Sequence, residues 1–282
     1  MKTFNQINMD GMLYNYNLEI VDTQKGEAIS GDVTVQVDAE GTTATLRYFA
    51  YPTYNNGKEN RTFGILKDML DGKYKTVTEN GDDADWIALS GSIDSSYFMP
   101  QGQNDIEEMA CAQKARGSFI NANQKKQYRN SWKLDMLITD IQMVDTDEEK
   151  GLDAYLKVNG YWIDDYRDLI KFVKLQARTE AAMAYISGLE ASQNQPYYVN
   201  VRGGMAKVDR VVVRKNAFGE DEKEVYSSTC WQIGAMDPEP YDFFDDAIMG
   251  EAKYKELKDN LEEHKKEIFK KSQEDSDNGL TF

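Results

Sequence analysis

The sequence predicts an α+β protein that is mostly β and carries a helix near its C-terminus. Apolar and polar residues alternate with a period of two through much of the first third of the 282 residues, which is typical of strands. Glycine and acidic turn residues separate these runs. A long helical spacing of apolar residues appears late, from Gly250 to Lys271. With 40% apolar and 11% aromatic residues, the chain can build a packed core.

The first elements are a strand and a hairpin. Asp32–Val37 and Ala44–Tyr51 each alternate apolar and polar residues, and Asp38–Gly41 reads as the turn between them. Met12–Val21 predicts a further strand beside this hairpin. Together they predict three strands before any helix.

A short helix and another strand follow. Thr62 can cap a helix that ends at Leu70, with Phe63, Leu66 and Leu70 on one face. After a polar turn, Trp86–Ile93 predicts a strand.

The second half repeats this order. It predicts two strands, a helix, a strand and a hairpin, which are Leu152–Ile163, Leu169–Leu175, Thr179–Leu189, Tyr197–Met205, and Arg210–Lys215 with Val225–Ile233.

Strands, one short helix and then more strands is the order of the OB fold, a small partly open barrel that binds oligonucleotides. We therefore predict an OB-fold-like barrel core, and the sequence leaves open whether it is one elaborated barrel or two in tandem. The predicted body spans residues 1–236, with a subdivision into 1–108 and 135–236 joined by a basic connecting segment, 109–134. Residues 237–272 are predicted as a linker and helix, and 273–282 as a disordered acidic tail.

The late helix has an apolar seam with one histidine in it. Tyr254, Leu257, Leu261, His264 and Ile268 follow at spacings of three and four residues. Fewer than three heptads is short for a coiled coil. The helix either docks on the body or forms a dimer contact.

Several kinds of chemistry lack their residues. His264 is the single histidine, so neither a Ser-His-Asp triad nor a histidine-based metal site is expected. Cys111 and Cys230 do not have a zinc-site spacing, and no phosphate-binding Gly-rich motif occurs. We predict no cofactor, no metal and no enzymatic activity.

One acidic cluster offers an alternative. Asp209, Asp221 and Lys223 are the residue types of a magnesium-dependent nuclease. Such a site needs rigid strands, whereas residues 218–223 read as a hairpin tip, so a solvated turn is the better interpretation.

The compartment is predicted from cysteine use and hydropathy. Two cysteines are too few for a disulfide framework, which favours a reducing compartment. The N-terminus shows no signal peptide, and no apolar run approaches the roughly 18 residues of a membrane span. We therefore predict a cytoplasmic protein without a membrane partner.

The strongest internal signal is a basic segment in an acidic chain. The net charge of −16 disfavours nucleic acid as a partner unless cations gather locally. Residues 109–134 contain no Asp or Glu, and cations alternate there with aromatic residues, the combination that binds single strands. The predicted nucleic-acid-binding residues are Lys114, Arg116, Phe119, Lys125, Lys126, Tyr128, Arg129, Trp132 and Lys133. The alternative is a basic loop that neutralises the body, with Trp132 in the core.

A second aromatic group lies on the predicted hairpin. Tyr48 and the Phe49/Tyr51 pair point to opposite faces of their strand, and Tyr54 follows in the loop. One set belongs to the core, and the other would be a stacking platform if it is exposed.

The last nine residues, Glu-Asp-Ser-Asp-Asn-Gly-Leu-Thr-Phe, form an acidic segment with an aromatic end. This segment resembles the acidic C-terminal tail of bacterial and phage single-stranded-DNA-binding proteins, although Thr281 stands where proline usually precedes the final Phe. The resemblance implies a tail that recruits replication and recombination proteins and competes with DNA for the binding groove. The residues that carry it are Glu274, Asp275, Asp277, Leu280 and Phe282.

The leading hypothesis is a protein that coats and protects single-stranded DNA in phage or mobile-element replication and recombination, in the host cytoplasm. The alternative is a virion or assembly protein that forms homo-oligomers, which explains the acidic body better.

Overall fold

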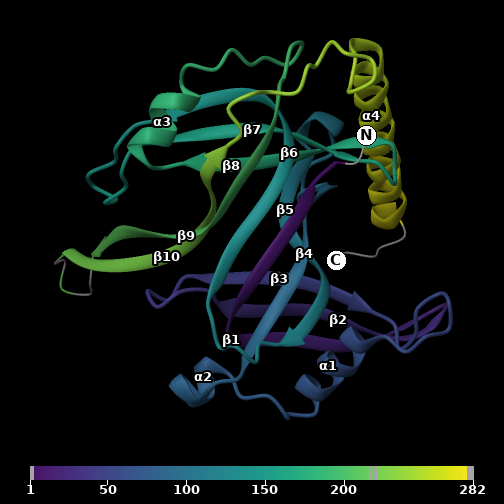
Figure 1. Ribbon diagram of the computed structural model, residues 1–282, viewed down its shortest axis with the longest axis vertical. Helices are drawn as coiled ribbons and strands as arrows, with labels where there is room; N and C mark the ends of the chain where they lie inside the picture. The colour runs from purple at the N-terminus through teal and green to yellow at the C-terminus, as the bar shows by residue number, and fades with distance from the viewer. Residues whose placement is uncertain (1–2, 216–217, 219–220, 278–282) are drawn as a thin grey trace.

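The computed structural model describes residues 3–215, 218 and 221–277. Within these residues, ten strands form one sheet in the order β2-β3-β5-β4-β1-β6-β7-β8-β10-β9. Two additional ladders, β1 with β2 and β6 with β9, fold this sheet into two closed barrels. Figure 1 shows one barrel below the other, with the long strands β1 and β6 running between them.

The first barrel has the OB order. Its strands are β1 (Asn5–Thr23), β2 (Gly26–Gln36), β3 (Thr43–Ala50), β4 (Trp86–Phe98) and β5 (Ala110–Ala122). Helix α1 (Arg61–Leu70) lies between β3 and β4 in sequence, followed by the short helix α2 (Val77–Asn80) and the 3₁₀ turn η1 (Gly81–Asp83). A second 3₁₀ turn, η2 (Ile106–Glu108), precedes β5. Strand β5 pairs antiparallel with β4 and parallel with β3, which closes the barrel.

The second barrel repeats this arrangement. Its strands are β6 (Arg129–Val144), β7 (Tyr155–Asp164), β8 (Leu169–Ala177), β9 (Tyr197–Lys215) and β10 (Asp221–Met236), and helix α3 (Glu180–Ile186) lies between β8 and β9. Strand β10 pairs antiparallel with β9 and meets β8 in parallel. The predicted OB-like, mostly β fold is therefore confirmed, in its tandem form.

The segment predicted as a connector, residues 109–134, is built into both barrels. It contains all of β5 and the start of β6, so only residues 123–128 link the two barrels. The barrels are also joined directly, because β1 pairs with β6 from Asn5↔Leu134 to Asp10↔Arg129. The predicted subdivision into 1–108 and 135–236 is therefore corrected. Residues 123–128 form a turn between two strands of one continuous sheet.

Alternation decides which residues of the strands enter the core. In β3, Ala44, Leu46, Tyr48 and Ala50 are buried, while the residues between them point outward. The β2–β3 hairpin predicted from this pattern is confirmed, with Gln36 opposite Thr43 across the turn. One apolar cluster contains residues of both barrels, so the two units share a core.

Helix α1 covers one end of the first barrel. Phe63, Leu66 and Met69 are buried on its inner face. The N-cap is Asn60, whose side chain accepts a hydrogen bond from the Thr62 backbone N–H at 3.1 Å. Thr62, predicted as the cap, is instead buried and donates its hydroxyl to the Ser118 carbonyl at 3.3 Å.

Helix α4 (Glu251–Asp277) docks on the body, as one of the two sequence alternatives predicted. Tyr254, Leu257 and Leu261 are buried against an apolar cluster that includes Ile163 and Ile170 of the second barrel. The helix extends to Asp277, so Glu274–Asp277, predicted as disordered, continue the helix. The remainder of the predicted tail, with Leu280 and Phe282, lies outside the described residues.

A buried lysine holds the two barrels together. The Lys171 side chain on β8 is 7% exposed, and its Nζ lies 2.5 Å from Asp94 Oδ1 of β4 and 3.3 Å from Asp164 Oδ2 at the end of β7. The ion pair with Asp94 crosses from one barrel to the other.

None of the helices in the described residues has the length and apolar character needed to cross a bilayer.

Candidate nucleic-acid interface

The predicted basic patch occupies the outer face of the sheet at two places. Lys114, Arg116 and Phe119 lie on β5 with exposed side chains. Arg129 and Lys133 lie on β6, and the two strands are separated by β4 and β1. Lys125, Lys126 and Tyr128 lie in the exposed turn that joins β5 to β6.

The strand register brings the cations of these strands into one row. Arg47 of β3 is paired with Arg116, which is also opposite Ser92 of β4. Residues paired across a ladder point to the same face. These three side chains therefore form one end of the row.

The other end of the row lies on the second barrel. Gln6 is the residue before Ile7, which pairs with Gly91 of β4, so Gln6 lies beside Ser92. Gln6 is paired with Lys133, and Lys133 is paired with Arg202 of β9. We call the residues Arg47, Arg116, Ser92, Gln6, Lys133 and Arg202 the cation row.

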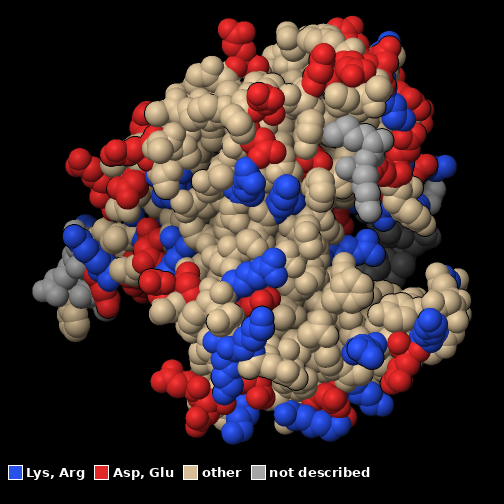
Figure 2. Space-filling view, viewed as in Figure 1, with Lys and Arg blue, Asp and Glu red and all other residues tan. Residues whose placement is uncertain are grey.

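The cation row crosses the join between the barrels. Its arginines and Gln6 are exposed, and Ser92 and Lys133 are partly exposed. Its members alternate with core residues such as Leu46, Ala115 and Ile7, which places all of them on the outer face. In the view of Figure 2, Lys and Arg gather down the middle of the molecule, over β1 and β6, whereas Asp and Glu gather near α4 and along the left edge.

The cations of the row differ in their pairing. Arg47 lies 3.7 Å from Asp32 and Arg202 lies 2.5 Å from Asp237, both at exposed positions where solvent screens the interaction. Lys133 Nζ lies 4.6 Å from the centroid of the Phe4 ring. Arg116 has no ion-pair partner among the described residues, so its guanidinium is available to a phosphate or a base.

Acidic groups near this face are partly neutralised by their surroundings. Asp10 pairs with Arg129 across the β1–β6 ladder. Burial raises the pKa of the Asp10 carboxyl above its usual range, and the Arg129 charge opposes that rise. This carboxylate lies on the same face of β1 as Gln6 and faces a cation from the predicted patch.

Trp132 is the one predicted binding residue that the structure removes from the surface. Its ring is 2% exposed, packs against Trp231 at a centroid distance of 6.2 Å, and donates its indole N–H to the Gly204 carbonyl at 3.1 Å. A side chain in this position cannot stack on a base. The core alternative considered for Trp132 is therefore correct.

The other two predicted rings differ in their availability. Phe119 is 58% exposed and lies opposite Ser90, on the same face as the cation row. Tyr128 is 40% exposed and packs on Trp86 at a centroid distance of 4.8 Å. Phe119 is thus an open stacking surface, and Tyr128 forms part of a fixed aromatic pair.

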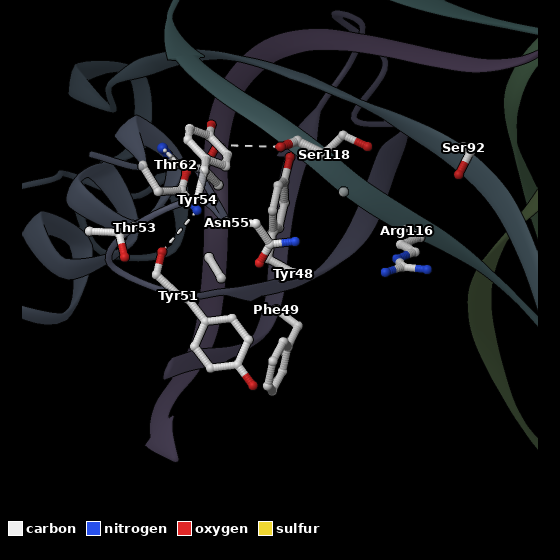
Figure 3. Close-up of a pocket in the computed structure, with 13 residues that line it drawn as sticks. Tyr48, Phe49, Tyr51, Thr53, Tyr54, Asn55, Thr62, Ser92, Arg116 and Ser118 are labelled. Carbon is white, nitrogen blue, oxygen red and sulfur yellow. Dashed lines mark hydrogen bonds between the residues drawn. The ribbon is translucent and has the colours of Figure 1, made fainter. Parts of the chain in front are cut away.

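The hairpin aromatics divide between core and surface as their alternation predicted. Tyr48 is buried, and its hydroxyl donates to the Phe119 carbonyl at 3.0 Å. Phe49 is 55% exposed and contacts Tyr51 edge to face, with centroids 5.4 Å apart. Phe49 and Tyr51 line a pocket of about 460 Å³ with Tyr54 and Arg116, shown in Figure 3.

Arg47, Arg202 and Gln6 were not predicted from the sequence as members of the interface. Each lies at an outward position of a strand, so its exposure could be predicted from alternation. Their proximity to Arg116 and Lys133 depends on which strands pair, and no local pattern contains that information. The burial of Trp132 did have a local signal, because Trp132, Leu134 and Met136 alternate with polar residues.

The residues of the nuclease alternative do not converge. Asp209 is opposite Ser227 on the exposed part of the β9–β10 hairpin, whereas Asp221 is opposite Lys215. Six residues of strand therefore separate the two positions, roughly 20 Å. In the described residues, no group of three or more His, Cys, Asp and Glu could hold a metal ion.

A sequence model of one protein family, described as YorF, matches residues 3–267. The chain belongs to the YorF family. No curated protein matches this member of the family.

Solved structures with a similar fold include the single-stranded DNA binding protein from Thermus aquaticus. A deletion mutant of that protein has 15% sequence identity and a TM-score of 0.50, covering 86% of this chain and 97% of its own. The wild-type protein has 14% identity and a TM-score of 0.46, covering 87% of this chain and 100% of its own. At this identity, the similarity to the mutant establishes the fold that the YorF-family chain shares.

Proposed function

We propose that this chain binds single-stranded DNA along the cation row, as a coating protein without enzymatic activity. The observation that carries the proposal is the row itself, which places Arg116 and Lys133 on one exposed face across both barrels. The shared fold with a single-stranded DNA binding protein agrees with it.

The dimensions of the row suit a single strand. From β3 to β9 the row crosses five strand spacings of about 4.8 Å each, roughly 24 Å. Cations at its two ends can contact several phosphates of one strand, and Phe119 offers a ring for a base. The uncharged side chains between them, Ser92 and Gln6, avoid repulsion of the backbone.

The acidic character of the chain limits binding to this face. A net charge of −16 repels nucleic acid from most of the surface, so the row acts as a local attractive region. We expect strong dependence on salt, because each phosphate contact releases counterions.

Removing the two central cations is expected to weaken binding. Arg116→Ala with Lys133→Ala should lower the affinity for poly(dT) roughly tenfold for each cation, since a hydrogen bond to a charged group contributes about 1.5 kcal/mol. The slope of log affinity against log salt should become shallower by about 1.4, at about 0.7 per contact on single strands. Fluorescence anisotropy over a salt series measures both quantities.

The matched control removes two exposed lysines of α4, Lys255 and Lys266, which lie away from the row. This variant has the same change in net charge and should bind nearly as the wild type does. Equal losses in the two double variants would show that total charge, rather than the row, governs binding. Double-stranded DNA of the same length serves as the competitor that tests strand preference.

The acidic C-terminus is the proposed docking segment for replication and recombination proteins, in the phage or mobile-element setting inferred from sequence. The acidic residues Glu274, Asp275 and Asp277 at the end of α4 also compete with DNA for the row in this proposal. Deleting Glu274–Phe282 should therefore raise DNA affinity at low salt, and added salt should reduce the difference. Folding should persist, because the buried α4 residues Tyr254, Leu257 and Leu261 precede the deletion.

A variant of unchanged length separates charge from chain length. Glu274→Gln, Asp275→Asn and Asp277→Asn together should reproduce most of the gain in affinity. Unchanged or weaker binding after the deletion contradicts competition by the tail.

A further inference from the structure

A pocket opens on the first barrel at the end of the cation row. Phe49 and Tyr51 come from β3 and the residue that follows it, and Tyr54 and Asn55 come from the loop before α1. Arg116 of β5 lies at the opposite side of the space, as Figure 3 shows. The pocket volume is about 460 Å³, and its mouth is open to solvent.

Hydrogen bonds fix the loop that forms one wall. The Tyr54 backbone N–H donates a hydrogen bond to the Lys58 carbonyl at 2.8 Å, and Thr53 and Glu59 form an antiparallel β-bridge. The Asn60 side chain donates to the Tyr51 carbonyl at 2.9 Å. The aromatic wall is therefore held in place before any ligand arrives, which lowers the entropic cost of binding.

The opposite wall is fixed as well. Arg116 lies between its ladder partners Arg47 and Ser92, and the neighbouring Gly117 has Tyr48 directly beneath it. A Cβ at Gly117 would lie 2.3 Å from the Tyr48 ring, so only glycine allows this packing. The buried ring thus sets the position of the strand that carries Arg116.

The groups that face the pocket are suited to a planar, hydrogen-bonding ligand. The rings of Phe49 and Tyr51 offer apolar surface, and a guanidinium can stack on a planar group. The Asn55 carboxamide lines the pocket, offers a donor and an acceptor in one plane, and has no hydrogen-bond partner among the described residues. No acidic side chain lines the pocket.

We infer that this pocket takes one unstacked base of the bound strand, between the aromatic wall and Arg116. The inference rests on the proposed function and adds a fixed position to it, because Arg116 belongs to both the row and the pocket. A phosphate that lies at the row near Arg116 places its own base at the mouth of the pocket. One nucleotide is then held by its base, while its neighbours are held by their phosphates.

Photochemical cross-linking tests the position of the base. The probe is an oligo(dT) that carries 5-iodouracil at one site, moved in turn along the strand and irradiated with the full-length protein. Trypsin places Phe49, Tyr51 and Tyr54 on one peptide, residues 48–58, and Phe119 on another, residues 117–125. Adducts on peptide 48–58 are the expected result, and adducts confined to other peptides overturn the inference.

A pair of matched substitutions supplies the second measurement. Phe49→Ala should weaken oligo(dT) binding roughly tenfold, as expected for one lost stacking contact, and should abolish the adduct. Phe98→Ala removes an exposed phenylalanine of β4 that does not line the pocket, and should change neither quantity. Equal binding by the two variants overturns the inference.

Two further outcomes distinguish failure of the pocket from failure of the proposed function. Oligo(dT) binding that depends on Arg116 and Lys133 but gives no pocket adduct leaves the proposed function standing and rejects the pocket. Absence of any oligonucleotide binding rejects both. Free thymidine monophosphate present during irradiation should not suppress formation of the adduct, because it lacks the neighbouring phosphates. Full suppression would assign the pocket to a free nucleotide instead.

Discussion

Lys171→Ala is expected to lower the free energy of unfolding by about 3–5 kcal/mol. The lysine is buried, and its Nζ contacts Asp94 of the first barrel and Asp164 of the second. Its removal would leave two carboxylates, each 14% exposed, without the cation that compensates them. An uncompensated buried charge costs far more than a lost surface ion pair. Urea denaturation followed by circular dichroism measures the change.

Lys174→Ala is the matched control, because Lys174 lies on the same strand with an exposed side chain. We expect a change within about 0.5 kcal/mol for this variant. A loss below about 1 kcal/mol for Lys171→Ala would mean that water enters the junction and replaces the lysine. Such a result would also weaken the view that this ion pair holds the barrels in register.

Trp132→Ala is expected to destabilise the protein by about 3–5 kcal/mol, the range for removing a buried aromatic ring. The ring fills the space beside Trp231 and lies so close to Gly203 that a Cβ there would be 2.7 Å from it. The substitution also leaves the Gly204 carbonyl without its indole donor. Trp132→Phe keeps most of the apolar contact and should lose less.

Phe119→Ala tests whether Phe119, unlike the buried Trp132 of the same predicted patch, lies at the surface. Phe119 is 58% exposed, so its removal should change the stability by no more than about 0.5 kcal/mol. DNA binding should respond in the opposite way, weakening for Phe119→Ala and unchanged for folded Trp132→Phe. Equal stability losses for Trp132→Ala and Phe119→Ala would place both rings in similar surroundings and contradict the structure.

The strands of the first barrel show how far local pattern reaches. Alternation through Ala44–Tyr51 predicted the inward side of Tyr48 and the outward side of Phe49, since side chains of a strand alternate by geometry. Strand β5 was not predicted, because Gly117 and the extra residue of its bulge interrupt the alternation. Strand β6 was missed because Leu134 to Thr139 are all buried, on both faces.

The candidate site was predicted in composition and only in part in arrangement. The absence of acids from 109–134 directed attention to Arg116, Phe119 and Lys133, which share the outer face. Although these residues belong to one segment of the chain, β4 and β1 lie between the two strands that carry them in the sheet. The distance between these residues depends on ladders formed with residues far away in sequence.

The sequence by itself determined the mostly β class, the repeated strand and helix order, and the inward or outward side of residues such as Tyr48 and Phe49. These properties depend on backbone periodicity and on residues within a few positions of one another. Only the tertiary structure decided that two barrels close, that Trp132 is buried, and that Arg47, Arg116, Lys133 and Arg202 form one row. The reason is that burial and alignment arise from pairing between distant strands, whose register is set when the whole core packs.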